Sequence, residues 1–410
     1  MNEYLVTSES VTEGHPDKLC DQISDGILDR YLEQDPEARV AVEVMASKNT
    51  IMIAGQVSAR VVLDVTEIAR QVIRDIGYDD EIKGLDYQTC LVLTNINHQS
   101  ADIARGVDQF TNREPALYVP SGSGCRWVRK EGEASGQIKD LGAGDQGIMY
   151  GYASNETANY LPITMDLASK LARRLGEIRK TGQVEWLYPD GKTQVTMKYD
   201  ENERPLAITS IVISAQHRDG VELAAVKNAI LREIIKPVID DQWLTPSTSI
   251  HINPTGRFVI GGPMGDTGLT GRKIMVDTYG GVGKHGGGAF SGKDPTKVDR
   301  TGAYMARYVA KNIVAAGLAD RCEVSLAYAI GLPEPEAVRI NTFDTEHIDR
   351  AVIESRVRDS FSFSVINMIK TLKLKRPQFL KTAAYGHFGR EDQGFAWEET
   401  NQMEALLNNG

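Results

Sequence analysis

The chain contains the segment PTGRFVIGGPMGDTGLTGRKIMVDTYGGVGKHGGGAFSGKDPTKVDR, residues 254–300 of 410. Thirteen glycines lie between Gly256 and Gly292 and alternate with basic side chains. Glycine adds no packing surface and loses much backbone entropy on folding, so this many glycines do not help to build a core. Backbone N–H groups in such loops can instead form a concave anion site, to which nearby Lys and Arg add full positive charge. The segment therefore predicts a polyphosphate site.

The same segment carries four aspartates, at positions 266, 277, 294 and 299. A hard divalent cation that shares its shell with phosphate oxygens is held by such carboxylates. We therefore expect a divalent metal ion beside the bound phosphates.

Three other interpretations of the segment fit less well. Residues 281–286 spell GVGKHG after an expected strand at 273–278, but no helix begins behind them, as the dinucleotide fingerprint requires. Residues 287–293, GGAFSGK, match the start of the phosphate-loop motif, yet Asp294 stands where a Ser or Thr hydroxyl is needed. A flexible linker would lack the interleaved basic and apolar residues.

The composition is that of a globular protein with a large core, because 41% of the residues are apolar and 25% are charged. The net charge of −10 argues against nucleic acid as the main partner. The sequence has no apolar run long enough to cross a membrane, and MNEYLVTSES does not resemble a signal peptide, so we expect a cytoplasmic protein without membrane contact. The four cysteines form no C-x-x-C pair, which argues against a zinc site or a disulfide framework.

Apolar spacing predicts the same order of elements three times: helix, two strands, helix and, in two of the rounds, a further strand. The rounds cover 17–32, 40–44, 51–57, 65–76 and 88–94, then 163–180, 193–199, 206–214, 221–235 and 248–253, then 298–318, 322–330, 336–342 and a helix from 347. We therefore predict an α+β fold of three similar α/β domains, whose mixed, mostly antiparallel sheets are covered by helices. The predicted domains are 1–98, 142–258 and 259–410.

The segment 99–141 interrupts this pattern, because apolar periodicity is lost and Ser-Gly-Ser-Gly occurs at 121–124. A segment of this length without secondary structure inside a compact domain is either disordered or covers a functional site. We predict a lid over the active site.

The start of the first helix, GHPDK at 14–18, places His15 and Asp17 where free N–H groups and the helix dipole attract anions. From spacing alone, a structural role for these two residues is as plausible as a functional one. Asp17, Asp21, Asp25 and Asp29 form an i, i+4 stripe, and for Asp21 and Asp29 we interpret it as a solvated helix face.

Three further positions are ambiguous from sequence alone. Glu43 lies on the opposite face of its strand from Val42, so it is either exposed or directed into a cleft. The residues YPDGK at 188–192 are typical of a tight hairpin turn. Phe258, inside the run FVI, is more typical of a core residue than of a nucleobase contact.

Four long motifs are present in one order: GHPDK at 14–18, GAGDQG at 142–147, GGPMGD at 261–266 and GGGAFSGKDP at 286–295. Together they closely resemble the methionine adenosyltransferase family, also called S-adenosylmethionine synthetases, over nearly the whole chain. The resemblance implies a bacterial-type transferase of class EC 2.5.1.6 that makes S-adenosylmethionine from ATP and L-methionine. In that reaction the methionine sulfur attacks the ribose 5′ carbon, and the released triphosphate is hydrolysed to phosphate and pyrophosphate.

The resemblance also implies roles for individual residues. Those at the reacting phosphates are His15, Lys192, Arg272, Lys273 and Lys293. ATP is expected to contact His15, Asp145, Asp190, Arg257, Phe258, Asp266, Arg272, Lys273, Ala289 and Lys293, and methionine Gln56, Gln99, Asp266 and Lys297. Two magnesium ions per site are expected, with Asp17 and Asp299 as ligands, and a potassium ion at Glu43. The family's active sites are shared within a homodimer, and bacterial members pair dimers into homotetramers.

The chain departs from the family pattern in two places. Gln56 stands where the family usually has a Glu that meets the methionine ammonium group, and the lid is longer between about 110 and 141 than in short-loop bacterial members.

Two rival functions remain open at this point. A kinase-like enzyme would release ADP, and a nucleotide sensor would bind ATP without consuming it.

Overall fold

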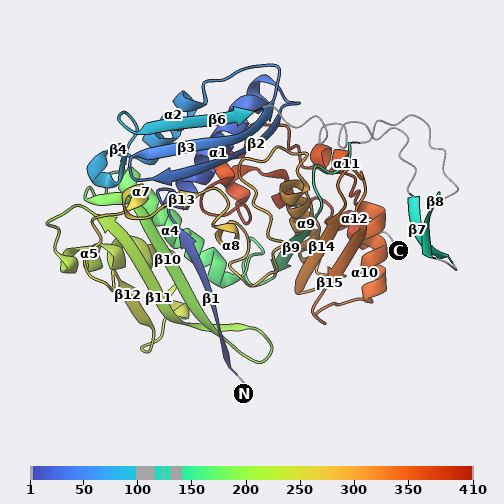
Figure 1. The fold of residues 1–410 in the computed structure, drawn as a ribbon. Coiled ribbons are helices and arrows are strands. Elements are labelled where there is room, and N and C mark those ends of the chain that lie inside the picture. Colours follow the sequence, from blue (N-terminus) through green and yellow to red (C-terminus); the bar gives the residue numbers. More distant parts are fainter. Residues whose placement is uncertain (1–2, 98–115, 122–123, 130–140, 409–410) are drawn as a thin grey trace.

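The computed structural model describes residues 3–97, 116–121, 124–129 and 141–408. Three sheets occupy three sides of the molecule (Figure 1). In the part of the chain that is described, no helix is long and apolar enough to cross a membrane. The predicted α+β architecture with three helix-covered sheets is confirmed.

Each sheet is built on an antiparallel hairpin that follows a long helix. In the first, α1 (Pro16–Gln34) precedes β2 (Arg39–Ser47) and β3 (Thr50–Ser58), and α2 (Val65–Ile76) leads to β6 (Leu91–Asn97), which pairs parallel with β3. In the second, α4 (Ile163–Lys180) precedes β10 (Leu187–Tyr199) and β11 (Pro205–His217), and α5 (Leu223–Ile230) leads to β12 (Ser249–Ile252), parallel to β11. In the third, α9 (Val298–Ala315) precedes β14 (Arg321–Tyr328) and β15 (Ala337–Asn341), with α10 (Arg350–Ser360) behind them.

The sheets also exchange strands, which the sequence did not predict. β1 (Tyr4–Val11) pairs antiparallel with β10, β9 (Gly147–Ser154) with β14, and β13 (Gly268–Leu269) with β2. Each strand lies in the chain before one long helix, yet it joins the sheet of another unit, as the placement of β1 beside β10 shows (Figure 1). The first unit gives β1 to the second sheet, the second gives β9 to the third sheet, and the third gives β13 to the first sheet. Each sheet therefore contains a strand from another part of the chain.

Shorter elements connect these units. They are β4 (Asp79–Asp80), β5 (Leu85–Asp86), α6 (Lys236–Val238), α7 (Gly262–Gly265), α8 (Ile274–Asp277), α11 (Val365–Thr371) and α12 (Met403–Asn408), with 3₁₀ turns at 81–83, 241–243, 380–382, 391–393 and 396–398 and a π-helical turn at 231–235. In the segment predicted as a structureless lid, β7 (Ala116–Ser121) and β8 (Gly124–Arg129) form an antiparallel hairpin. The remainder of that segment, with Gln99, lies outside the described residues.

Two local predictions were wrong. The expected strand at 273–278 is the short helix α8, because the glycine-rich segment gives it no neighbouring strand to pair with. The expected turn at 188–192 lies inside β10, where a register shift between Leu187 and Gly191 lets the strand pass through turn-like residues. The helix predicted at 221–235 is confirmed as a continuous helical stretch over 223–238, in which a π-helical turn lies between α5 and α6.

The acidic stripe of α1 is also not a solvated face. Asp17, Asp21 and Asp25 are at most 1% exposed, because α1 is covered on this side by chain segments that follow residue 268. Asp29 is half-buried and accepts hydrogen bonds from three backbone N–H groups at 378–380. A charged face is therefore packed inside the molecule.

A buried polar network compensates these charges. Lys18 Nζ lies 2.8 Å from Asp21 Oδ2 and 2.5 Å from Asp277 Oδ1. Arg300 donates two hydrogen bonds to Asp25, of 2.7 and 2.9 Å. Removing one partner from such a pair costs about 3–5 kcal/mol, because the other charge is left buried.

His387 joins the two halves of this network. Its Nδ1 is hydrogen-bonded to the Tyr304 hydroxyl at 2.6 Å, and that hydroxyl accepts from Arg300 Nε at 3.0 Å. Its Nε2 lies 3.6 Å from Asp277 Oδ1, which is too long for a hydrogen bond. Burial lowers the pKa of His387 to about 4, against the opposing field of Asp277, with Arg300 and Lys18 adding to the decrease. The imidazole is therefore neutral at pH 7.

This pKa predicts how a His387→Gln variant responds to acid. Below pH 6.5 the unfolded chain binds a proton at His387 that the folded chain does not bind until about pH 4, so the wild type loses stability over this window. The variant lacks this loss, while all other groups titrate in both proteins. The stability difference between wild type and variant should be largest at pH 7 and decrease by on the order of 3 kcal/mol by pH 4. Urea unfolding at several pH values measures it.

His347→Gln is the matched control, because His347 is exposed and contacts Gly317 O and Asp320 at the surface. This variant measures what the loss of an exposed imidazole does to stability over the same range. A His387→Gln difference that stays constant between pH 7 and pH 4 would contradict the predicted pKa.

Candidate active site

The first cluster of site residues lies at the start of α1. Lys273 Nζ is 2.6 Å from Asp17 Oδ2, and Arg272 Nη1 is 3.6 Å from Asp17 Oδ1. The backbone N–H of Leu269 also donates to Asp17 at 3.0 Å. Burial acts to raise the pKa of Asp17, but the Lys273 and Leu269 hydrogen bonds outweigh it and the pKa is lowered. Asp17 is thus an anion already surrounded by cations.

His15 caps the same helix in its neutral form. Its Nδ1 accepts a hydrogen bond of 3.1 Å from the Asp17 backbone N–H, so the proton of the neutral ring is on Nε2. Burial and the neighbouring Lys273 lower the pKa of His15 to about 3, and Lys192 contributes to the decrease. His15, Asp17, Lys192, Arg272 and Lys273 are called the helix-start cluster below. It offers one neutral donor and three cations.

The loop before α1 fixes the position of Asp190. A Cβ on Gly14 would lie 2.3 Å from Pro189 Cβ, so only glycine allows this close approach. Asp190 Oδ2 accepts a hydrogen bond of 2.9 Å from the Gly262 N–H, which brings the segment with Asp266 beside it, whereas its buried Oδ1 has no hydrogen-bond partner among the residues that the structure describes. Burial raises the pKa of Asp190 to about 6. The free acceptor is available for a donor on a ligand.

Arg257 and Phe258 lie at the edge of the second sheet. The backbone of Phe258 exchanges two hydrogen bonds with His217, of 2.9 and 3.2 Å, and its ring is half-exposed. The interpretation of Phe258 as a core residue was therefore wrong. Arg257 is exposed and pairs with Asp219 at 2.9 Å.

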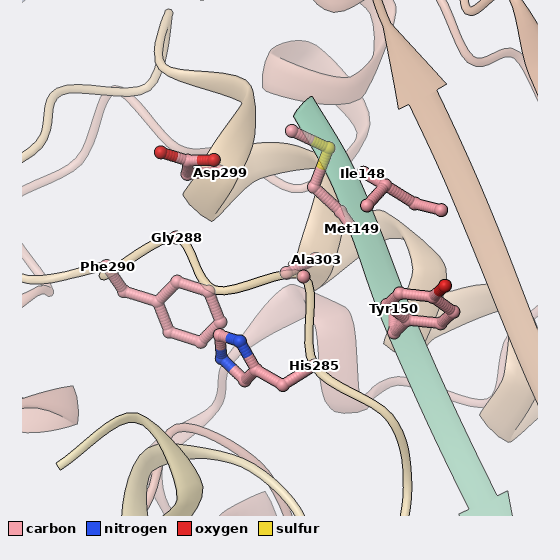
Figure 2. A pocket seen from close by; sticks show the side chains of 9 residues that line it. Ile148, Met149, Tyr150, His285, Gly288, Phe290, Asp299 and Ala303 are labelled. Carbon is pink, nitrogen blue, oxygen red and sulfur yellow. The ribbon is translucent and has the colours of Figure 1, made fainter. Parts of the chain in front are cut away.

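The second cluster lies on the glycine-rich loop at 286–293. Lys293 Nζ is 2.5 Å from Asp299 Oδ2, at the start of α9. A Cβ on Gly288 would lie 2.3 Å from the Asp299 carboxyl group, so the loop passes directly over it. Figure 2 shows Asp299, Gly288 and His285 around a cavity of about 10 Å³ beside β9, which is room for about one water molecule.

Four more predicted residues lie near this loop. Lys297 pairs with the buried Asp294 at 2.9 Å, and its side chain packs 3.1 Å from the Cβ position of Gly144, the neighbour of exposed Asp145. Ala41 of β2 forms a bridge with Lys293 and pairs with Gln56 of β3. Glu43 is exposed on the same outward face as Gln56. Lys293, Lys297, Asp299, Glu43, Gln56 and Asp145 are called the glycine-loop cluster.

The two clusters are separate in one chain. Lys273 is paired with Asp17 and Lys293 with Asp299, each inside its own cluster, and among the described residues no hydrogen bond or ion pair joins one cluster to the other. The side chain of Ala289 lies against Gly271, where an added Cβ would be 2.5 Å away, so the two loops approach closely at these two small residues. Within the described ranges, no group of three or more metal-ligating side chains is present.

Comparison with known proteins identifies the family. Models of the S-adenosylmethionine synthetase N-terminal, central and C-terminal domains match residues 3–101, 140–258 and 260–399. The chain belongs to the S-adenosylmethionine synthetase family. It is 55% identical over 406 residues to S-adenosylmethionine synthase 1 of Rhodospirillum rubrum, covering 99% of this chain and 98% of the relative. It is 53% identical over 407 residues to S-adenosylmethionine synthase 1 of Rhodopseudomonas palustris strain BisB18, covering 99% of each chain.

These matches confirm the predicted family, the fold and the transferase class of an S-adenosylmethionine synthetase. The individual residue roles stay predictions. Sequence reasoning missed the carboxylates of Asp21 and Asp25, which hold the backbone of both loops. Their i, i+4 spacing was visible, but spacing does not show which side of a helix is covered.

Proposed function

We propose that the chain forms S-adenosylmethionine from ATP and L-methionine and hydrolyses the released triphosphate to phosphate and pyrophosphate. A lone pair on the methionine sulfur forms the bond to the ribose 5′ carbon while the bond from that carbon to the triphosphate oxygen breaks. The sulfur carries no proton, so no general base is required. The helix-start cluster supports this proposal most directly, since its cations and the neutral His15 suit a leaving group that gains negative charge.

In this proposal the residues of the two clusters bind opposite sides of the substrates. His15, Lys192, Arg272 and Lys273 contact the triphosphate from one side and Lys293 from the other. Asp190 and Asp266 with Arg257, Phe258, Asp145 and Ala289 contact the rest of ATP. Gln56, Gln99 and Lys297, with Asp266, bind methionine.

Magnesium and potassium ions are the proposed cofactors. Asp17 and Asp299 fit magnesium ligands because both are carboxylates beside phosphate-binding lysines, and Mg²⁺ commonly combines one or two carboxylates with phosphate oxygens. When bound, the metal ions would neutralise phosphate charge. Glu43 fits a potassium ligand as an exposed carboxylate next to the glycine-rich loop.

The partner that completes the site is proposed to be a second copy of the chain. The outward face of the first sheet exposes Met45, Met52, Leu91 and Leu93 side by side, which is typical of a surface covered by another subunit. Glu43 and Gln56 share this face, so a partner there would reach the glycine-loop cluster. We propose a homodimer in which the helix-start cluster of one copy meets the glycine-loop cluster of the other, and a homotetramer of two such dimers.

The activity is tested by incubating the protein with ATP, methionine, Mg²⁺ and K⁺. We expect a sulfonium product by mass spectrometry, together with phosphate and pyrophosphate. Omitting Mg²⁺ should abolish product formation, and omitting K⁺ should reduce it. Release of ADP instead would favour a kinase-like enzyme, and ATP binding without consumption would favour a nucleotide sensor.

The shared site is tested with mixed dimers purified by two different affinity tags. One chain carries Lys273→Ala and the other Lys293→Ala. If the clusters of opposite chains meet, one site keeps both lysines and about half of the wild-type activity should return, although each homodimer is nearly inactive. The control pairs a wild-type chain with a Lys273→Ala/Lys293→Ala chain and should stay inactive. Equal activity of the two mixed dimers would refute the shared site.

Gln56→Glu tests the effect of having Gln in place of the family's usual Glu at the methionine site. A hydrogen bond to a charged group contributes about 1.5–3 kcal/mol, against about 0.5–1.5 for a neutral one, so restoring the carboxylate should strengthen contact with the methionine ammonium group. We expect a lower KM for methionine and an unchanged KM for ATP. Steady-state kinetics with each substrate varied gives both values, and equal methionine KM values would contradict the role of Gln56.

A further inference from the structure

The acidic stripe of α1 binds backbone at four successive turns. Asp17 accepts from the Leu269 N–H at 3.0 Å, and Asp21 from the Gly271 N–H at 2.8 Å. Asp25 accepts from the Gly292 N–H at 2.8 Å. Asp29 accepts from the three N–H groups at 378–380, each at 2.9 Å. One helix face therefore holds three separate chain segments by their backbone.

Two of these bonds lie next to the cations of the site. Gly271 directly precedes Arg272 and Lys273, and Gly292 directly precedes Lys293. We propose that Asp21 and Asp25 are positioning residues for two different active sites of the dimer. Asp21 orients the Arg272–Lys273 pair of one site, and Asp25 orients Lys293 of the other. The assignment to two sites rests on the proposed shared-site enzyme.

The backbone at both glycines explains why a fixed acceptor is needed. Gly271 has φ +80° and Gly292 φ +79°, in the left-handed region that glycine enters freely. Glycine has no Cβ that selects one conformation, so the direction of the next side chain depends on what the N–H group binds. A Cβ on Gly292 would also lie 1.9 Å from Val42 O, so no other residue could be used to stiffen this turn.

The carboxylates themselves are rigid. Asp21 and Asp25 are fully buried, and each is held by its own cation, Lys18 or Arg300. Each buried carboxyl oxygen is therefore a fixed acceptor for the backbone N–H group of its loop. The loops are thus fixed from the inside by groups that never contact the substrates.

Asp29 gives the matched comparison on the same face. It also accepts backbone N–H groups, but these precede no residue of the site. Asp29→Ala should therefore lower the thermal midpoint of unfolding and leave kcat of the folded enzyme unchanged. Asp21→Ala and Asp25→Ala should lower kcat by about 10- to 100-fold, as expected when reacting groups shift by about 1 Å. Their KM for methionine should change much less.

Conservative variants separate positioning from charge. Asp21→Asn keeps an oxygen acceptor for Gly271, and Lys18 stays paired with Asp277. It should recover most of the kcat lost in Asp21→Ala. If Asp25→Ala does not fold because Arg300 is left unpaired, Asp25→Leu/Arg300→Met removes both charges together and takes its place. Loss of kcat only in proportion to the unfolded fraction would overturn the proposal.

Mixed dimers test the assignment to two sites. A chain with Asp21→Ala combined with a chain carrying the folded Asp25 variant should regain about half of the wild-type activity, because one site keeps both carboxylates. A wild-type chain combined with a chain carrying both changes should not. The mixed dimer of one Lys273→Ala chain and one Lys293→Ala chain gives the activity expected for one intact site. If the mixed lysine dimer regains activity and the mixed aspartate dimer does not, the positioning proposal fails while the shared site stands. If the wild-type protein forms no sulfonium product, the proposed activity itself is refuted.

Discussion

The structure depends on burying the carboxylates of α1 with every acceptor satisfied. A carboxylate that leaves water without partners costs several kcal/mol, so a helix with an acidic stripe cannot be covered by apolar side chains alone. Here the covering segments are rich in glycine, and they supply N–H groups and cations in place of a hydrophobic surface. The glycine-rich segment has no core of its own, and α1 could not be buried without it. Each requires the other to fold.

The exchange of strands extends this dependence to all three units. β1, β9 and β13 each leave their own segment of sequence and pair with the hairpin of another unit. Displacing one unit would break a ladder in a neighbouring sheet, so the units cannot rotate freely about their linkers. The positions of the helix-start and glycine-loop clusters, which lie at the junctions between units, are therefore set by the whole chain. Preorganised charge of this kind does not need to be rearranged when a reaction occurs.

Sequence reasoning predicted the parts of the fold that local signals determine. The bounds of α2 and α4 were predicted to the residue. Apolar spacing shows the extent of each helix, and a glycine follows each C-terminal end. The partners of β1 and β9 were not predictable, because pairing across the chain leaves no local periodicity. The residues at 188–192 have turn composition, and only their cross-strand neighbours keep them in β10. The site residues were predicted from motifs shared with a family. Residue spacing alone does not show that Lys273 and Lys293 lie in two separate clusters.

The pairing of Lys273 and Lys293 with carboxylates bears on how their charges can be used. Lys273 with Asp17 and Lys293 with Asp299 are close ion pairs, so each lysine is held in place before any phosphate arrives. A lysine on a free four-carbon chain would lose about 2 kcal/mol of rotamer freedom on binding, and part of that loss has already occurred in the folded protein. In the proposed enzyme, Asp17 and Asp299 would hold the magnesium ions, and Lys273 and Lys293 would contact the phosphate oxygens from positions that the fold has already set.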